Sequence, residues 1–154
     1  MSELVVGTNH VGFTVSELDR PIAMFRELFG YDLASLAPRE PRNIERLTSI
    51  EGADIMVAHL RKEGLVGIEL IRYLGPADAK KVDARPCDTG FAHVTYDVSD
   101  IDRMVEKAAA FDLKPIGEMI RSTAGPNVGA RAIYLRDTDG IGVELIQPAR
   151  FAKD

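Results

Sequence analysis

The amino-acid sequence contains two copies of one motif, and this internal repeat constrains the fold more than any other feature. HVGFTVSELDR, residues 10–20, returns as HVTYDVSDIDR at residues 93–103, an offset of 93 − 10 = 83. GIELI at residues 67–71 returns as GVELI at residues 142–146, an offset of 144 − 69 = 75. We predict that the chain is a duplicated unit, with a longer connection in the first copy.

Each copy is predicted to follow the order β-α-β-β-β. In the first copy, an alternating strand over residues 8–15 precedes a helix from Asp19 to Phe29, with Pro21 in its first turn and Gly30 at its end. Further strands are expected near residues 31–36, up to about residue 60 and over 65–74, with PREPRN as a loop and RKEG as a turn. The second copy has a helix over residues 102–111 and a hairpin turning at 138–140.

These patterns predict an α+β chain of two tandem βαβββ modules. The first module is expected over residues 1–75 and the second over 90–154, with residues 76–89 as the linker. The formal net charge of −5 argues against nucleic acid as a partner, because phosphate binding depends on dense basic patches. No apolar run approaches a membrane span, and the N-terminus lacks a signal-peptide layout, so a cytoplasmic location with no membrane partner is expected.

Strand alternation predicts that two histidines and two glutamates project from matching places. On the first strand of each copy, His10 and His93 point away from the apolar side chains that should receive the helices. On the closing strands, Glu69 and Glu144 lie opposite the apolar face in the same way, beside small glycines. Both histidines fall at one repeat position and both glutamates at another.

This set favours a divalent metal ion. A duplicated fold has no structural need for two carboxylates on apolar strands, and placing them together is costly unless a cation compensates their charge. Two imidazoles and two carboxylates suit Zn, Ni, Co, Mn or Fe. Each residue taken alone is open to a structural interpretation, as a core histidine or a solvated glutamate.

The chain resembles the vicinal oxygen chelate superfamily, which includes glyoxalase I, methylmalonyl-CoA epimerase, extradiol dioxygenases and the fosfomycin- and bleomycin-resistance proteins. The resemblance rests on HVGFTVSELDR, GIELI and the ending DTDGIGVELIQP, and covers nearly the whole chain. It implies that the two modules form a cup-shaped open mixed-sheet barrel with metal ligands on the first and last strands of each module. The family's ligand positions fall on His10, Glu69, His93 and Glu144.

The resemblance implies a divalent-metal-dependent isomerase or lyase that acts through a metal-chelated enediolate or enolate. The glyoxalase I of bacteria carries His, Glu, His and Glu at the ligand positions, and methylmalonyl-CoA epimerase carries Gln at the position of Glu69. The substrate is then a small molecule with adjacent oxygens, and Glu144 and Glu69 are the candidate bases. The alternatives are an extradiol-type Fe(II) dioxygenase and a non-catalytic small-molecule binder similar to bleomycin-resistance proteins.

Other residues carry weaker expectations. A loose alignment with the epimerase makes Asp54 a second carboxylate candidate, although a polar residue near a turn is an equal interpretation. His59 is expected at the surface near a hairpin end. Loop arginines could meet an anionic substrate group or be solvated, namely Arg39, Arg42, Arg46 and Arg72. Homodimerisation is expected because family members commonly pair and exposed sheet edges invite it; whether a cup is built within one chain or across two stays open.

Overall fold

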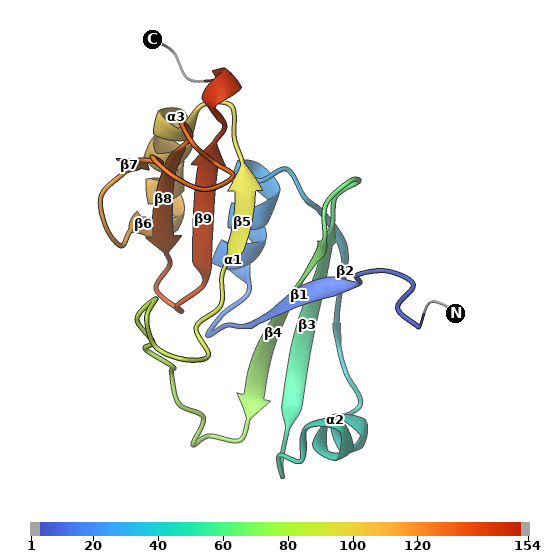
Figure 1. The fold of residues 1–154 in the computed structure, drawn as a ribbon. Helices are drawn as coiled ribbons and strands as arrows, with labels where there is room; N and C mark the ends of the chain where they lie inside the picture. Colours follow the sequence, from blue (N-terminus) through green and yellow to red (C-terminus); the bar gives the residue numbers. More distant parts are fainter. Residues whose placement is uncertain (1–3, 152–154) are drawn as a thin grey trace. The chain divides into compact units, whose positions relative to one another are not determined.

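The chain forms two compact α+β units, residues 1–80 and 81–154, in a computed structural model that describes residues 4–151. Each unit contains one mixed sheet, and the two sheets share one strand topology (Figure 1). In the described residues neither sheet closes on itself. The predicted α+β class with two βαβββ modules is confirmed, while the closure of the modules into one cup stays a prediction.

In the first unit the strand order is β1-β4-β3-β2. Strand β1 runs parallel to β4, and the other neighbours are antiparallel. The elements are β1 His10–Thr14, α1 Asp19–Ala23, the π-helical segment η1 Met24–Leu28, β2 Asp32–Pro38, α2 Pro41–Thr48, β3 Asp54–Arg61 and β4 Gly67–Gly75.

The second unit repeats this topology with the order β5-β9-β8-β6, and β7 pairs with β8. Strand β5 runs parallel to β9, as β1 does to β4. The elements are β5 Val94–Asp97, α3 Ile101–Ala108, the 3-10 segment η2 Ala109–Phe111, β6 Lys114–Pro115, β7 Ile120–Arg121, β8 Arg131–Arg136, β9 Gly142–Gln147 and the 3-10 segment η3 Ala149–Phe151. Across residues 4–151, no helix has the length and apolar character that a bilayer span requires.

The first helix begins with Asp19 as its first residue and Leu18 at the cap position, and it continues through the π-helical segment η1. It ends at Gly30, whose φ of 74° belongs to the left-handed region that glycine adopts most readily, and whose N–H donates to the Arg26 carbonyl at 3.1 Å. The helix buries Phe25 completely, with the ring of Tyr31 5.8 Å away edge-on. This aromatic packing covers the apolar face of the first sheet.

Strand alternation separates a core face from a more polar face in the first strand of each unit. In β1, His10, Gly12 and Thr14 are exposed, and the residues between them are partly buried. In β5, Val94 and Tyr96 are buried and the residues after each are exposed. The predicted orientation of these strands is confirmed, so the histidine side of each sheet is the side away from the core.

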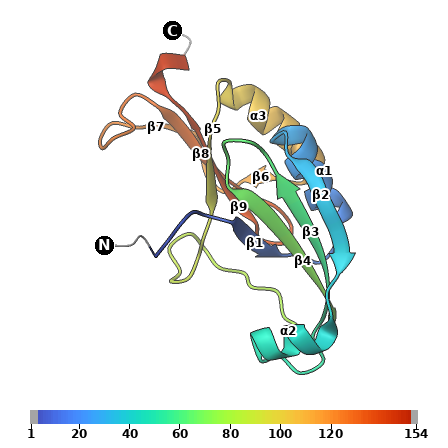
Figure 2. The same cartoon turned by 90° about the vertical axis from the view of Figure 1, so that its right-hand side faces the viewer.

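Helix α2 corrects the prediction of a loop at PREPRN. The Glu40 side chain caps the helix by accepting hydrogen bonds from the backbone N–H groups of Arg42 and Asn43, at 3.3 and 2.9 Å. Pro41 occupies the first turn, where its missing N–H has no cost. Figures 1 and 2 both show α2 at the end of strands β3 and β4. Proline and arginine suggested a loop, whereas the acidic cap and the first-turn proline begin a helix.

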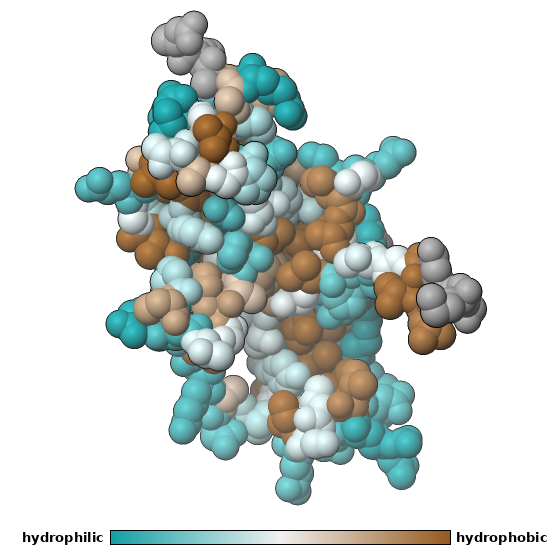
Figure 3. Space-filling view, in the orientation of Figure 1, coloured by the Kyte–Doolittle hydropathy of each residue, from teal (hydrophilic) through white to brown (hydrophobic). Residues whose placement is uncertain are grey.

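Packing against the first sheet holds α2 in place. Its buried Ile44 contacts a cluster that includes Ile55 and Val57 of β3, with Ile71 and Tyr73 of β4 packed against it. Val57 pairs with Ile71 in the β3–β4 register, and His59 pairs with Glu69 two residues further along. Because side chains alternate along a strand, the cluster lies on the same sheet face as His59 and Glu69. Hydrophobic side chains reach the surface over this sheet in Figure 3. The polar face of the first unit is therefore partly apolar.

Candidate metal centre

Three strands of the first unit bring two imidazoles and one carboxylate together. Glu69 lies in the centre, because its β4 position pairs with Gly12 of β1 on one side and with His59 of β3 on the other. Its Oε2 is 3.2 Å from His10 Nε2, and its Oε1 is 3.4 Å from His59 Nε2. One ligand atom from each of His10, His59 and Glu69 falls within 4.8 Å of the others.

A neighbouring amide orients His10. Its Nδ1 is 2.8 Å from the side-chain oxygen of Asn9, which can only accept, so Nδ1 carries the proton and Nε2 presents a lone pair. Arg61 holds Asn9 in turn, donating to its carbonyl at 2.7 Å and to its side-chain oxygen at 3.2 Å. A hydrogen bond from the second ring nitrogen is the usual support of a metal-binding histidine.

His59 is also an acceptor at Nε2. Arg39 Nη2 lies 2.9 Å from that atom, and a guanidinium can only donate. The pKa of His59 is lowered, first by burial and further by the charges of Arg39 and Arg61, although Glu69 acts in the opposite direction. His59 is therefore held neutral at pH 7. Its side chain is 21% exposed, which corrects the expectation of a surface histidine.

The chemistry of this trio fits a divalent transition-metal ion. Two imidazole nitrogens and one carboxylate converge, with the Nδ1 proton of His10 directed to Asn9 and Nε2 of His59 accepting from Arg39. Negative charge and ring acceptors gathered in this way favour a cation, and Arg39 supplies one on the His59 side. Imidazole with carboxylate suits Zn, Fe, Mn, Co or Ni. The residues that could hold the ion in the first unit are His10, His59 and Glu69.

The second unit brings its own histidine and glutamate together. His93 Nε2 is 3.4 Å from Glu144 Oε2, and this oxygen also accepts a hydrogen bond from the Thr95 hydroxyl at 3.0 Å. Tyr134, the β8 partner of Glu144, places its hydroxyl 3.4 Å from His93 Nε2. The pKa of Tyr134 is raised by burial and by the negative charge of Glu144, so the phenol stays protonated and remains a donor.

Glycine is required where the first strand of each unit passes its closing strand. A Cβ on Gly67 would lie 2.8 Å from the backbone oxygen of Asn9, and a Cβ on Gly142 would lie 3.0 Å from that of Ala92. The approach at Gly67 is closer than real Cβ contacts allow, and the approach at Gly142 is tighter than most of them. Small residues were expected to leave room beside the glutamates. Each glycine leaves this room for the backbone of the segment that carries the histidine, His10 or His93.

Each predicted pair of ligands thus meets within its own unit. His10 and Glu69 are in contact in the first unit, and His93 and Glu144 are in contact in the second. The joining of the two pairs around one ion stays a prediction.

A family model described as the glyoxalase/bleomycin resistance protein/dioxygenase superfamily matches residues 9–134. The chain belongs to this superfamily. A 2-epi-5-epi-valiolone epimerase from Actinomyces sp is 29% identical over 145 residues, which are 92% of this chain and 79% of the relative. The resemblance inferred from the sequence is confirmed.

Solved structures of the superfamily share the fold. A glyoxalase family protein from Bacillus cereus has a TM-score of 0.80 at 27% identity, with 95% of this chain and 96% of that chain covered. A fosfomycin resistance protein from Listeria monocytogenes, solved with Mn(II) and sulfate, has a TM-score of 0.59 at 15% identity, with 94% and 93% covered. At this lower identity the likeness concerns the fold alone.

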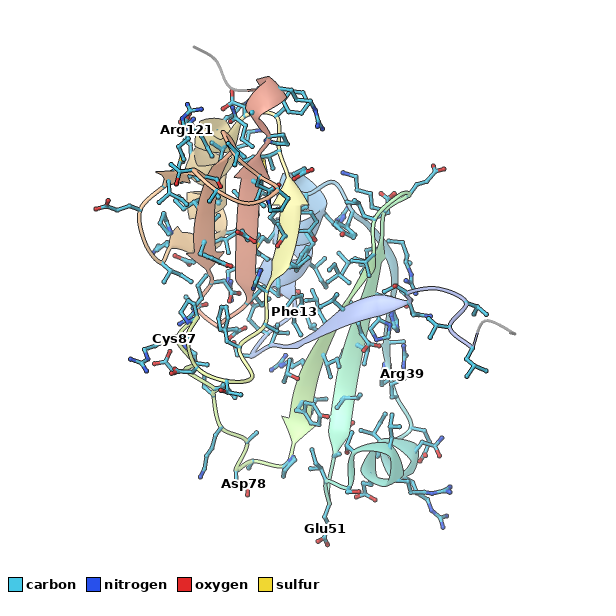
Figure 4. The ribbon with its side chains drawn as sticks, in the orientation of Figure 1. Phe13, Arg39, Glu51, Asp78, Cys87 and Arg121 are labelled. Carbon is cyan, nitrogen blue, oxygen red and sulfur yellow. The ribbon has the colours of Figure 1, made fainter. Side chains whose placement is uncertain are left out.

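Asp54 does not join the trio of this superfamily member. It opens β3 opposite Gly75, five residues from His59 along the strand. At about 3.3 Å per residue this is roughly 16 Å, so Asp54 is too far away to contact Glu69. Of the four arginines proposed for an anionic group, Arg39 contacts a member of the trio, His59. It lies beside β3 in Figure 4.

The role of His59 and its contact with Arg39 were missed because they depend on strand register. The predicted turn RKEG contains a signal that would have found His59, since residues 59 and 69 are equally distant from Gly64, whose φ is 75°. A hairpin centred on this glycine pairs the two residues. Arg39 follows β2, whose Ser35 pairs with His59, and no local sequence pattern predicts its contact with that histidine.

Proposed function

We propose that this chain is a divalent-metal-dependent isomerase that moves a proton at a carbon next to a carbonyl, in a small substrate with adjacent oxygens. The observation that carries the proposal is the convergence of one ligand atom from each of His10, His59 and Glu69, with Nδ1 of His10 engaged by Asn9 so that its Nε2 can ligate. Membership of the superfamily and the likeness to an epimerase support an enzyme of this class.

The relative narrows the reaction within the class. Its name denotes the epimerisation of a ketone, 2-epi-5-epi-valiolone, and its similarity extends over 92% of this chain. Epimerisation next to a ketone proceeds by removal and return of one proton, which needs a base and a means of stabilising the enediolate. We therefore propose an α-hydroxyketone as the substrate class, in preference to a glutathione adduct or a CoA thioester.

The two glutamates are proposed to have different roles. Both oxygens of Glu69 face imidazoles, so this residue is suited to holding the ion. Glu144 uses Oε2 for Thr95 and His93, and Oε1 has no hydrogen bond among the described residues. A carboxylate with one anchored oxygen and one available oxygen is suited to accepting a substrate proton, so Glu144 is the proposed base.

The ion supplies Lewis acidity, which stabilises negative charge on the substrate's oxygens as the proton leaves. Within each unit, a neighbouring residue orients the proposed group. Asn9 keeps His10 in the tautomer that can ligate, and the Thr95 hydroxyl fixes the Glu144 carboxylate. Ile71, which lies next to Gly12 on the same face, contributes an apolar wall that limits water.

Solvent exchange tests this proposal. The protein reconstituted with Mn, Co, Ni, Zn or Fe is incubated with 2-epi-5-epi-valiolone in D₂O, and proton NMR follows deuterium entry next to the carbonyl. Exchange should need the metal, and Glu144→Gln should lower its rate by about 10²- to 10⁴-fold while metal binding persists. Glu69→Gln should instead lose the metal.

A matched control is Glu63→Gln in the exposed β3–β4 turn, which should leave exchange and metal content unchanged. Methylglyoxal with glutathione, and methylmalonyl-CoA, serve as competing substrates. Faster exchange or turnover with either of these would replace the α-hydroxyketone assignment. A protein that binds none of the five metals would contradict the metal-dependent enzyme and favour the small-molecule binder.

One observation favours a second candidate, an Fe(II) oxygenase of the ring-cleaving kind. Two histidines and one carboxylate with open positions are the ligand set typical of non-haem Fe(II) oxygenases, and the first unit holds this set in His10, His59 and Glu69. Oxygen consumption by the Fe(II)-loaded protein with catechols measures this activity. Consumption that His59→Phe abolishes would favour the oxygenase over the isomerase.

A further inference from the structure

The Nε2 lone pair of His59 has two possible partners. In the structure it accepts a hydrogen bond from Arg39 Nη2 at 2.9 Å. The same atom is 3.4 Å from Glu69 Oε1, and the other oxygen of that carboxylate is 3.2 Å from His10 Nε2. A ring nitrogen has one lone pair, so it cannot bond to the guanidinium and to a metal ion at the same time.

Arg39 is placed for this contact by the end of β2. Its Nη1 lies 3.4 and 3.3 Å from the carbonyl oxygens of Ala37 and Pro38, which are long contacts. The adjacent acid, Glu40, is engaged with backbone N–H groups at the start of α2. Among the described residues, the side-chain partner of the Arg39 charge is the neutral imidazole of His59.

His59 differs from His10 in its support. Nδ1 of His10 is tethered to Asn9, which keeps the ring oriented toward Glu69 without any other contact. Nδ1 of His59 is buried and has no hydrogen-bond partner among the described residues. The contact with Arg39 is therefore the main polar interaction that orients the His59 ring, and losing it would leave Nε2, which is 3.4 Å from Glu69 Oε1, available to an ion.

We propose that His59 is a conditional metal ligand and that Arg39 competes with the metal ion for its Nε2. This inference rests on the proposed metal-dependent function and adds a residue that weakens metal binding. With Arg39 in place, His10 and Glu69 hold the ion without His59. When Arg39 withdraws, His59 completes a three-residue set, and the released guanidinium can donate to an oxygen of a metal-bound substrate.

Metal titration of four proteins tests the competition. Dissociation constants for Co(II) and Zn(II) are measured by competition with a chromophoric chelator for wild type, Arg39→Met, His59→Phe and the double variant. Arg39→Met should bind about tenfold tighter than wild type, as expected for removing a hydrogen bond from a charged donor. The double variant should bind no tighter than His59→Phe, because the benefit requires the imidazole.

The matched control is Arg42→Met, which removes the same charge from an exposed position three residues away. The visible spectrum of bound Co(II) gives a readout independent of affinity and activity. Arg39→Met should show the band shift of an added nitrogen ligand, and the double variant should not. Circular dichroism and thermal melting establish that each variant is folded, and His59→Gln replaces His59→Phe if the latter does not fold.

Each other outcome overturns the inference. Equal affinities of Arg39→Met and Arg42→Met would show that Arg39 does not compete. A tightening that persists in the double variant would show general charge repulsion rather than competition for His59. An unchanged Co(II) spectrum would show that His59 does not ligate. If wild type and every variant fail to bind any metal, the proposed function fails as well, whereas binding without dependence on Arg39 refutes this inference alone.

Discussion

The two units share a scaffold and differ in the groups around their glutamates. Glu69 and Glu144 occupy the same repeat position, each beside a histidine at 3.2 or 3.4 Å. The neighbouring strands differ, because Gly12 and His59 of the first unit correspond to Thr95 and Tyr134 of the second. The offsets are those of the repeat, 95 − 12 = 83 and 134 − 59 = 75.

This difference separates two chemical environments for one residue type. In the first unit, an imidazole nitrogen lies beside each oxygen of the carboxylate, and imidazole with carboxylate suits a divalent transition-metal ion. In the second unit, a threonine hydroxyl donates to the carboxylate and a tyrosine hydroxyl lies beside the histidine. Under the proposed function, the first environment would hold the ion and the second would orient the base. Duplication kept the backbone while side chains on the polar faces diverged.

The largest expected effect concerns α2, the helix that the described part of the second unit lacks between β6 and β8. Ile44→Ala should lower the free energy of unfolding by about 2–5 kcal/mol, because it leaves a cavity against Ile55 and Val57. Leu47 lies on the same helix but is 80% exposed. Leu47→Ala should change the free energy of unfolding by less than about 0.5 kcal/mol. Urea denaturation measures both; equal effects would show that α2 adds nothing specific to the first sheet.

The next effect compares Gln147 with its repeat counterpart Arg72, since 147 − 75 = 72. Gln147 is 4% exposed, and its Oε1 accepts the Ile101 N–H at 2.8 Å at the start of α3. Gln147→Leu should cost about 1–3 kcal/mol of unfolding free energy, because that buried N–H loses its partner. Arg72→Leu, at an exposed position, should be nearly neutral in the same denaturation experiment. A neutral Gln147→Leu would mean that Ile101 finds another acceptor.

A smaller effect tests the support of His10. Asn9 corresponds to Ala92, since 92 − 9 = 83, so Asn9→Ala makes the first unit resemble the second at this position. Metal affinity should fall at least tenfold, because His10 loses the acceptor that fixes its tautomer. Isothermal titration with Zn(II) measures the change, and Asn43→Ala in α2 is the control. An unchanged metal affinity would mean that the side chain of Asn9 does not distinguish His10 from His93.

The smallest effect uses pH to contrast His59 with Tyr134. Burial lowers the pKa of His59, so its contribution to folding is present above 6.5 and is lost as pH falls toward the lower folded value. Burial raises the pKa of Tyr134, so its contribution is present below 10.0 and is lost as pH rises toward the higher folded value. In acid, the unfolding free energy of the metal-free wild type should fall relative to that of His59→Phe. In alkali, it should fall relative to that of Tyr134→Phe. Parallel pH profiles for wild type and both variants would contradict these shifts.

Local regularities account for what sequence reasoning predicted well. The repeat located His10, Glu69, His93 and Glu144, and strand alternation assigned His10 and Glu69 to one face, because side chains in a strand point to alternate sides whatever the rest of the fold does. The second hairpin was predicted at residues 138–140, and Gly140 there has a φ of 97°. The helix at PREPRN was missed, since its cap and its apolar contact matter only once Ile44 has a sheet to cover.

The sequence by itself determined the duplicated βαβββ order, the superfamily, and the repeat positions of His10, Glu69, His93 and Glu144. Only the tertiary structure decided the cross-strand neighbours of each glutamate. In the first unit the neighbour is His59, which Arg39 contacts, and in the second unit it is Tyr134. The physical reason is that alternation and capping act between residues close in the chain. The partner across a hairpin depends on strand register, and an arginine contact depends on where a separate strand ends.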